Sequence, residues 1–404
     1  MDDINLSPVA RRTKGSSTFA MTLRANKLRE EGKEIIALNV GEPDFDTPDH
    51  IREAACLALK TKKSATRYAP VKGMPSLRSS VAEKLKRDNN LSFSTDQIII
   101  SSGAKQAIFN GIGTIVAEGD EVIIPAPYWV SYADMVVMSG AVPVPVVAGQ
   151  DQGFKITPSQ LEQSISPRSK LMLINSPSNP TGAMYSEREL FDLMQVVLKH
   201  PNIVVISDEI YEHITIGDQK HFSPLQVAPD LANRFILING VSKAYAMTGW
   251  RIGFAAGPRK IIDAMANIQS QQSGSVCSVS QLAAETALNG PQDCVHRMRD
   301  AFAKRHQLVL SRFANIEGFR CSPAQGGFYL FIDVTDAVNN LYKREKISSP
   351  NDVAFCDYLL EEAGVALMPG TFSGFGGHIR LSFAASTEVL NEAADRIALA
   401  VAKD

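Results

Sequence analysis

The sequence predicts an α/β protein built on a mostly parallel sheet flanked by helices. Short apolar runs recur along the middle of the chain, at residues 98–100, 122–124, 171–174, 203–206 and 235–238, and each is bounded by Gly, Pro, Asn or Ser. These runs are continuously apolar rather than alternating, which is typical of strands buried on both faces. Helical spacing lies between several of them, so we expect helices to cover both sides of the sheet.

One of the intervening helices can be followed from its start to its end. Ser186 and Glu189 have the spacing of a capping box, in which each side chain satisfies a backbone amide of the other residue. An apolar stripe at helical spacing follows, formed by Leu190, Leu193, Met194, Val197 and Leu198. The helix is expected to end at His200, because the residue before a proline disfavours helical backbone angles.

The chain changes character after about residue 290. A long charged helix is expected at 294–313, and residues 326–333 alternate like a sheet strand with one exposed face. This pattern predicts a second, α+β unit. A helix at about 22–31 and the segment 35–40 are expected to pack with it.

At 404 residues the chain exceeds one ordinary hydrophobic core, so two domains are expected. We place a large domain at 49–290 and a small, discontinuous domain at 1–48 and 291–404, the first part of which includes an N-terminal arm. The breaker cluster Asn289, Gly290 and Pro291 marks the later boundary.

Composition argues against several classes of protein. Lys and Arg total 41, Asp and Glu total 43, and the formal net charge is −2, so no electrostatic signature for nucleic acid or an anionic membrane is present. The most apolar long stretch, 128–148, contains Asp134 and two prolines, which disfavours a membrane span. The five cysteines form no CxxC pair, and the chain begins Met-Asp-Asp without a signal-peptide core. A cytoplasmic protein is expected.

Polar side chains follow three consecutive apolar runs. Asn179, Asp208 and Lys243 each come shortly after one of these runs, and open α/β sheets bind ligands at the carboxyl ends of their strands. Arg251 lies eight residues after Lys243 and offers a fixed cation. An amine, a cation and a buried carboxylate are what a pyridoxal-phosphate enzyme needs. The amine forms a Schiff base, the cation grips the phosphate, and the carboxylate keeps the ring nitrogen protonated.

Further candidates lie on other segments. Gly103, Ala104 and Lys105 follow the run 98–100 and begin a helix, where backbone amides could hold an anion. A plain strand–helix connection is the alternative for this turn. Trp129 could stack on a planar ring or belong to the core. Arg380 could bind a substrate carboxylate or form a surface ion pair.

The segment that contains Asp208 is open to other interpretations. Asp208 could cap a helix or form a salt bridge, and Asn179 could cap a turn. Tyr211 could donate its hydroxyl group to a phenolate oxygen. A metal site formed by Asp208, Glu209 and His213 is the remaining alternative, although no second cluster completes it.

Four motifs in order carry a resemblance to a known family. They are Asn-Pro-Thr-Gly at 179–182, Ser-Asp-Glu-Ile-Tyr at 207–211, the Ser-Lys to Trp-Arg segment at 242–251, and Arg-Leu-Ser-Phe at 380–383. Together they resemble fold type I pyridoxal-phosphate enzymes, and more narrowly class I aminotransferases of the bacterial aspartate aminotransferase branch. The resemblance covers about 14–383. It implies a homodimer with shared active sites and small-molecule amino acid and 2-oxo acid substrates. No metal is expected.

The resemblance also implies a role for individual residues. Lys243 would be the Schiff-base lysine and acid–base group, Asp208 the partner of the ring nitrogen, and Arg380 the ligand of the substrate α-carboxylate. Asn179 and Tyr211 would bind the ring oxygen of the cofactor, and Trp129 would stack on the cofactor ring. The cofactor phosphate would be bound by Gly103, Ala104, Lys105, Ser242 and Arg251, and by Tyr68 from the partner subunit. Gly41 would contact the substrate through its backbone. Trp129 and Asn179 would also contact the substrate.

The identity of the substrate follows less directly from the resemblance than the identity of the cofactor does. The segment 269–281 contains no arginine that could bind a distal carboxylate, whereas Lys14 and Thr18 match substrate-binding positions of the branch. A lysine there favours an acidic substrate, so we expect aspartate and 2-oxoglutarate to be converted into oxaloacetate and glutamate with ping-pong kinetics. Aromatic amino acids or prephenate are the alternative substrates, and a C–S lyase is a further alternative reaction.

Overall fold

The computed structural model describes residues 6–402, and its main feature is a seven-stranded sheet. The strands are β2 (Ile98–Ser101), β3 (Glu121–Ala126), β4 (Val142–Val147), β5 (Ser169–Asn175), β6 (Val204–Asp208), β7 (Phe235–Gly240) and β8 (Gly253–Ala256), in the order β2-β8-β7-β6-β5-β3-β4. All neighbours are parallel except β8, which runs antiparallel to β2 and β7. The predicted α/β class and the five predicted strands are confirmed.

The sequence did not reveal β4 and β8. Strand β4 lies at the sheet edge, contains two prolines and is largely exposed, so it lacks the continuous apolar run of a central strand. Strand β8 is Gly-Phe-Ala-Ala, and its small residues give little apolar signal although all four are buried.

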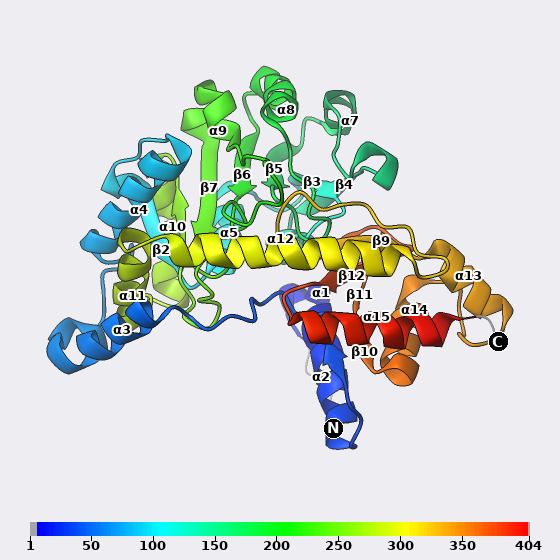
Figure 1. Ribbon diagram of the computed structural model, residues 1–404. Helices are drawn as coiled ribbons and strands as arrows, with labels where there is room; N and C mark the ends of the chain where they lie inside the picture. The colour runs from blue at the N-terminus through cyan, green and yellow to red at the C-terminus, as the bar shows by residue number, and fades with distance from the viewer. Residues whose placement is uncertain (1–5, 403–404) are drawn as a thin grey trace.

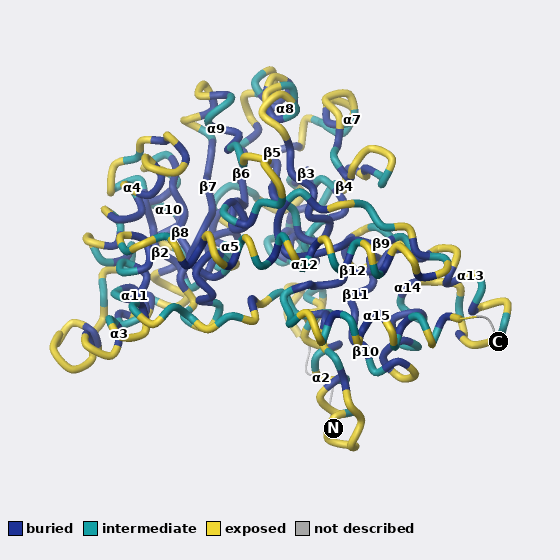
Figure 2. Tube along the Cα trace, in the orientation of Figure 1, coloured by how far each residue is buried: buried dark blue, intermediate teal, exposed yellow. Residues whose placement is uncertain are grey.

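Helices bury both faces of this sheet (Figure 1). The helices of this part are α3 (Asp49–Thr61), α4 (Pro75–Asn89), α5 (Ala104–Ile115), α6 (Ser131–Met138), α7 (Pro158–Ser164), α8 (Glu187–Lys199), α9 (Pro224–Val227), α10 (Arg259–Gln272) and α11 (Ser278–Asn289), and α3 packs against α11 rather than on the sheet. Neighbouring residues of one strand enter different cores: Ile206 packs with α5 and α10, and Val205 packs in the cluster that includes α4 and α8. This explains the continuous apolar runs, and Figure 2 shows the strands as the buried centre.

Helix α8 forms as the capping box predicts. The backbone amide of Ser186 donates to Glu189 Oε2 at 2.8 Å, and the amide of Glu189 donates to Ser186 Oγ at 3.3 Å. The helix ends before His200, next to the proline that restricts it.

The C-terminal part forms a separate antiparallel sheet of β11 (Met368–Pro369), β12 (His378–Ser382) and β9 (Tyr329–Asp333). Around it lie α12 (Asp293–Ala314), α13 (Thr335–Lys343), α14 (Asp352–Tyr358) and α15 (Thr387–Val401), and α12 crosses the front of the molecule (Figure 1). The prediction of one exposed face for 326–333 was wrong. Four of the five residues of β9 are buried, because both of its faces are packed: Leu330 and Ile332 lie in the main core, and Phe331 packs with Phe154 and Phe375.

The two ends of the chain meet in this part of the molecule. Strand β1 (Ile36–Ala37) pairs in parallel with β10 (Val365–Ala366), and α1 (Pro8–Arg12) and α2 (Ser17–Glu30) precede it. Helix α2 begins five residues before the predicted start at about residue 22. The domain bounds 49–290, 1–48 and 291–404 remain a prediction. Among the described residues, no helix has the length and apolar character that crossing a membrane requires.

Candidate active site

A cavity of about 250 Å³ lies where the seven-stranded sheet faces β9 and β12. It is lined by Thr18, Gly41, Ala104, Lys105, Trp129, Tyr132, Asn175, Asn179, Asp208, Ile210, Tyr211, Ser242, Lys243, Arg251, Tyr329 and Arg380. Residues separated by more than 300 positions in the sequence therefore share one space.

The three predicted strand ends meet at this cavity. Strands β5, β6 and β7 are parallel neighbours, with Asn175 opposite Asp208 and Asp208 opposite Ile238. Their carboxyl ends therefore point the same way. Asp208 reaches the cavity wall as the last residue of β6, and the loops after β5 and β7 bring Asn179 and Lys243 there.

Asp208 is a buried carboxylate without a cationic hydrogen-bond partner among the described residues. Its side chain is held by the hydroxyl of Tyr132, which donates to Oδ2 at 2.5 Å, and by the amide of Ile210, which donates to Oδ1 at 3.3 Å. Burial raises the pKa of Asp208 to about 6, although the hydrogen bond from Tyr132 lowers it. A cationic N–H in the cavity would relieve this buried charge.

Lys243 follows β7 and presents its amine to the same cavity. The ammonium donates to the carbonyl of Gly41 at 2.6 Å. Desolvation lowers the pKa of Lys243 to about 8, partly opposed by Glu42, and Arg251 lowers it further. An amine with this pKa carries a useful fraction of its neutral, nucleophilic form near physiological pH.

An anion cradle lies at the start of α5. Gly103 precedes the helix with φ +78°, and no side chain caps the helix amides. A Cβ at Gly103 would stand 2.1 Å from Nη2 of Arg251, so only glycine allows this close approach. Arg251 donates to two backbone carbonyls, at Thr248 and Ser102. The guanidinium and the free helix amides both favour a phosphate.

Arg380 is a buried guanidinium with neutral hydrogen-bond partners. It is 3% exposed. It donates to Oδ1 of Asn179 at 2.9 Å and to the carbonyl of Asn39 at 2.6 Å, and its Nε has no partner among the described residues. Because an unpaired buried charge is costly, this group is suited to bind a carboxylate that enters the cavity. The surface ion pair considered as an alternative is excluded by this burial.

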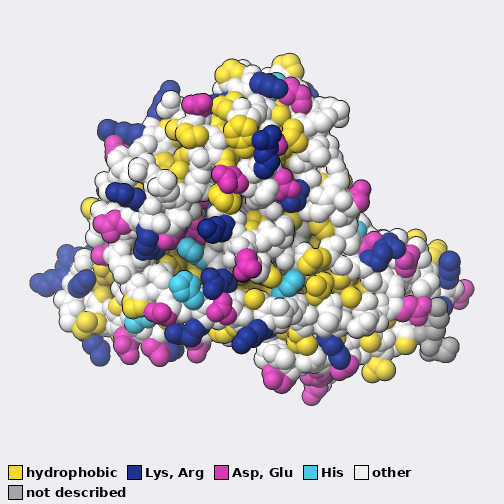
Figure 3. Space-filling view, turned by 45° about the horizontal axis from the view of Figure 1, so that its top comes forward, with side chains coloured by type: hydrophobic (Ala, Val, Ile, Leu, Met, Phe, Trp, Pro, Cys, Tyr) yellow, Lys and Arg dark blue, Asp and Glu magenta, His cyan; other side chains and the backbone are white. Residues whose placement is uncertain are grey.

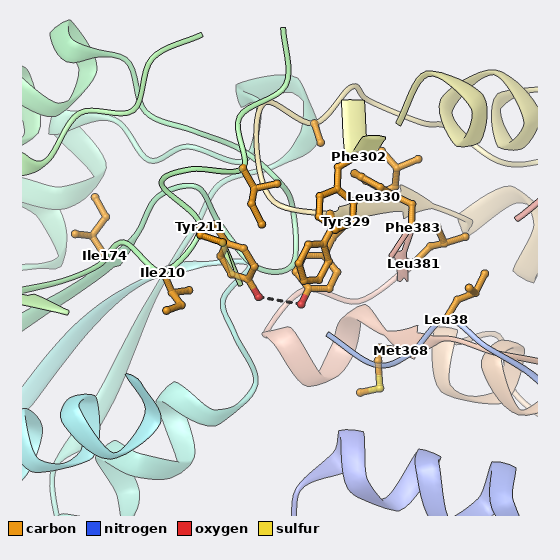
Figure 4. Close-up of a cluster of buried hydrophobic side chains, with 14 of the residues drawn as sticks. Leu38, Ile174, Ile210, Tyr211, Phe302, Tyr329, Leu330, Met368, Leu381 and Phe383 are labelled. Carbon is orange, nitrogen blue, oxygen red and sulfur yellow. Dashed lines mark hydrogen bonds between the residues drawn. The ribbon is translucent and has the colours of Figure 1, made fainter. Parts of the chain in front are cut away.

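Two tyrosines connect the two parts of the molecule at the cavity. The hydroxyls of Tyr211 and Tyr329 are 2.9 Å apart, and Figure 4 shows them pointing toward each other from opposite sides. Tyr329 also stacks beneath Arg380, whose guanidinium carbon is 4.8 Å from the ring centroid. Burial raises the pKa of both phenols, so they remain hydrogen-bond donors.

An aromatic wall completes the cavity. Trp129 packs edge-to-face with Tyr132 at 5.3 Å, and the ammonium of Lys105 lies 4.9 Å from the Trp129 ring. Desolvation and the charge of Arg251 lower the pKa of Lys105.

Three of the predicted residues do not line the cavity: Gly103, Lys14 and Tyr68. Gly103 directly precedes the lining residue Ala104. Lys14 is exposed, although its charge acts on Asp134 of α6, near Lys105. Tyr68 is fully exposed. Thr18, by contrast, contributes to the lining from the first turn of α2.

Sequence reasoning missed Tyr132, Tyr329 and Asn175. Tyr132 follows Trp129 by three residues, and α6 begins between them. Residues three apart on a helical turn share one face, so this spacing was the signal that Tyr132 lies beside Trp129. Asn175 is the last residue of β5, at the sheet edge that holds the other polar groups. No local signal marks Tyr329, because the packing of two distant segments brings it to the site.

The metal alternative is wrong in its residues. Asp208 is held by Tyr132. The group of possible metal ligands is instead Glu209, Glu212 and His221, whose ligand atoms lie within 4.8 Å of one another. Glu212, however, pairs with the buried ammonium of Lys84 and accepts from two asparagines. Glu209 accepts from Ser223 Oγ at 2.6 Å. These acidic groups are satisfied within the protein.

A ligand with an aldehyde, a ring nitrogen and a phosphate would meet a matching group at each point of the cavity. The amine of Lys243 suits the aldehyde, the unpaired carboxylate of Asp208 suits a protonated ring nitrogen, and the cradle at Gly103 and Arg251 suits the phosphate. Pyridoxal phosphate carries all three groups, so the fold and site define the class of pyridoxal-phosphate enzymes.

Comparisons with known proteins identify the family within this class. The family model described as aminotransferase class I and II matches residues 33–397. An aspartate/prephenate aminotransferase of Nitrosomonas europaea is 46% identical over 98% of this chain and 99% of its own length, and one of Cereibacter sphaeroides is 45% identical over 97% of both chains. The chain belongs to the class I and II aminotransferases and is a pyridoxal-phosphate-dependent aminotransferase.

Solved structures agree with this assignment. An aspartate aminotransferase of Rhizobium meliloti is 40% identical with a TM-score of 0.92, over 98% of this chain and 99% of that one. The aspartate aminotransferase of Thermus thermophilus with maleate is likewise 40% identical, with a TM-score of 0.90 and the same coverage.

Proposed function

We propose that this aminotransferase moves the amino group of aspartate to 2-oxoglutarate, giving oxaloacetate and glutamate. The observation that carries this proposal is the buried Arg380, which has only neutral hydrogen-bond partners and shares a cavity with the amine of Lys243. An α-carboxylate bound by Arg380 fixes the α-carbon of an amino acid in the space that Lys243 lines.

The residues divide into a cofactor set and a substrate set. Pyridoxal phosphate would be held by Gly103, Ala104, Lys105, Trp129, Asn179, Asp208, Tyr211, Ser242, Lys243 and Arg251, and the amino acid would be held by Gly41, Thr18, Trp129, Asn179, Arg380 and Lys14. When bound, the cofactor supplies an electron-withdrawing ring that accepts the electron pair released at the α-carbon.

The protein residues control the proton movements. Lys243 would take the α-proton of the amino acid with its neutral amine and hold it for return, and its pKa of about 8 leaves part of this amine neutral near pH 7. Asp208, when ionised, would keep a proton on the ring nitrogen. Tyr211 would donate to the ring oxygen, and Trp129 would cover the ring and exclude water.

An acidic substrate is favoured by the cations around the cavity. Lys105 lines it, and Lys14 lies near Asp134 on the same side. The relatives at 45–46% identity are described as aspartate/prephenate aminotransferases. Prephenate also carries a second carboxylate, so the same cations could bind either substrate, and prephenate is our second candidate.

Product analysis with the purified, cofactor-loaded enzyme tests these assignments. We expect aspartate and 2-oxoglutarate to give equal amounts of oxaloacetate and glutamate, and prephenate to accept an amino group from glutamate. Conversion of tyrosine but not aspartate would move the assignment to aromatic substrates. Release of ammonia or a thiol without a new amino acid would replace transamination with a lyase reaction.

A lysine substitution tests the mechanism. Lys243→Ala should abolish turnover, because it removes both the cofactor-bonding amine and the proton carrier. Lys155→Ala, which removes a partly buried lysine paired with Glu189 outside the cavity, is the matched control and should retain turnover. Normal turnover by Lys243→Ala would contradict the proposed role of Lys243 in transamination.

We also propose a cytoplasmic homodimer in which the partner subunit completes each active site. The fully exposed Tyr68 and the exposed Leu57 and Leu59 on nearby α3 support a subunit interface there. All five cysteines are free thiols, in agreement with a reducing compartment.

A further inference from the structure

Tyr132 connects two groups of the cofactor site but has no role in the mechanism above. Its hydroxyl donates to Asp208 Oδ2 at 2.5 Å, and its ring packs edge-to-face with Trp129 at 5.3 Å and 89°. The side chain is 1% exposed. One phenol therefore contacts both the carboxylate expected beneath the ring nitrogen and the aromatic side chain expected to stack on the ring.

The backbone holds Tyr132 in this place. Its amide donates to the carbonyl of Trp129 at 2.9 Å, which fixes the first turn of α6 (Ser131–Met138). The ring is packed in the core formed with α5 and α10, together with Leu171 and Leu173 of β5. The hydroxyl is thus aimed at Asp208 before any ligand enters.

Few other groups act on Asp208. Ile210 donates a backbone hydrogen bond, and the charges of Glu209 and Lys243 oppose each other in their effect. Glu209 makes its hydrogen bonds to Ser223 and His221 instead. Among the described residues, Tyr132 is the only side chain that donates a hydrogen bond to Asp208.

We propose that Tyr132 is the positioning residue that keeps Asp208 ionised and oriented for the cofactor's ring nitrogen, so that it sets the lowest pH at which the enzyme holds pyridoxal phosphate. The inference rests on the proposed role of Asp208. A protonated Asp208 would have to lose its proton before it could pair with a cationic ring nitrogen. Cofactor affinity should therefore fall with decreasing pH once Asp208 becomes protonated.

The test is the affinity of the cofactor-free enzyme for pyridoxal phosphate between about pH 5 and pH 9, followed by absorbance. Tyr132→Phe keeps the ring and its contact with Trp129 but removes the donor. A hydrogen bond to a charged group is strong enough to shift the acid limb of binding upward by about one pH unit or more. The affinity on the alkaline side of the limb should be retained.

Tyr185→Phe is the matched control. Tyr185 is also buried, and its hydroxyl accepts a hydrogen bond from the amide of Ile156 at 3.0 Å, but it lies outside the cavity lining. It should leave the acid limb in place. An unmoved limb in Tyr132→Phe, or an equal loss of affinity at every pH, would overturn the proposal and leave Tyr132 a packing residue.

A measurement without cofactor separates this proposal from the proposed function. The Asp208 carboxyl carbon can be titrated by NMR in the cofactor-free protein, with Asp208→Asn to assign its signal. Its pKa should rise in Tyr132→Phe and stay unchanged in Tyr185→Phe. No binding of pyridoxal phosphate by the wild type would contradict the proposed function, whereas an unmoved Asp208 titration would contradict the role of Tyr132 alone.

Discussion

At the scale of single residues, the site consists of charges that the protein itself leaves unpaired. Asp208 and Arg380 are buried, and each makes hydrogen bonds only to neutral groups. Lys243 has its pKa lowered by desolvation. Buried charges of this kind lower the free energy of unfolding. A bound ligand of opposite charge offsets this destabilisation, as is common at functional sites.

The lowered pKa of Lys243 makes the free energy of unfolding depend on pH. The folded pKa of about 8 lies below the unfolded value near 10.4, so the unfolded state binds more protons between these values. The destabilisation is therefore complete below about pH 8 and is lost as the pH rises toward about 10.4. In the cofactor-free enzyme, Lys243→Met should raise the free energy of unfolding by on the order of 2 kcal/mol at neutral pH.

Urea unfolding at neutral pH and at about pH 10 checks this prediction, because the gain should shrink at the higher pH. Lys155→Met provides the comparison, since Lys155 forms an ion pair with Glu189. An equal gain for Lys243→Met at both pH values would show that packing, not charge, is the cause.

Arg380→Lys should weaken substrate binding without releasing the cofactor. The ammonium of a lysine is a compact point charge and cannot reproduce the planar fork with which Arg380 reaches Asn179 and the carbonyl of Asn39 while it also binds a carboxylate. We therefore expect kcat/KM to fall about 10- to 100-fold, as for loss of a charge-assisted hydrogen bond. Steady-state kinetics and cofactor affinity measure the two effects separately. Arg320→Lys, at an exposed ion pair with Asp333, should change neither.

At the scale of elements, the ends of three strands and the start of one helix position the polar groups of the site. Strands β5, β6 and β7 deliver polar groups to one edge, and α5 directs its amides toward Arg251. Antiparallel β8 is required as well. A Cβ at Gly253 would stand 2.3 Å from the amide nitrogen of Ala104, so a small residue there lets α5 start close to the sheet.

Gly103→Ala should therefore weaken cofactor binding by at least about tenfold, because the new methyl group would displace Arg251 from the helix start. Gly217→Ala is the matched control. It has a similar positive φ of +73° but nothing within 4 Å of the added Cβ. Both variants should lose stability from backbone strain, and only Gly103→Ala should lose cofactor affinity in equilibrium titration.

At the scale of the whole molecule, the cavity depends on two bodies of the chain facing each other. The sheet of β9, β11 and β12 supplies Tyr329 and Arg380, whereas the seven-stranded sheet supplies Asp208. On the face shown in Figure 3, positive and negative side chains are interspersed over the surface, in keeping with a net charge of −2. The buried charged side chains Asp208 and Arg380 instead line the cavity.

The proposed dimer predicts that inactive variants restore each other. In a mixed dimer of Tyr68→Ala and Lys243→Ala chains, one site would combine Lys243 of the first chain with Tyr68 of the second. Co-expression should therefore recover activity that neither homodimer shows at limiting cofactor. Purified tagged heterodimers make the measurement, and a mixed dimer as inactive as its parents would contradict a site shared through Tyr68.

By itself, the sequence determined the α/β class, five central strands, the capping box of α8 and most of the cavity residues. Those strands are buried on both faces, so the apolar runs are local and readable. Lys243, Asp208 and Asn179 could be predicted because each follows such a run, and topology then required their ends to meet.

Only the tertiary structure decided the rest. Strand β8 has small residues whose burial depends on neighbours, β9 is covered on the side that its alternation left open, and Tyr132 and Tyr329 become site residues through partners 76 and 118 positions away. Local sequence patterns reflect which residues of a segment are buried and which are exposed to solvent. Which distant side chain it meets is set by packing of the whole chain, and that packing made Tyr132 the partner of Asp208.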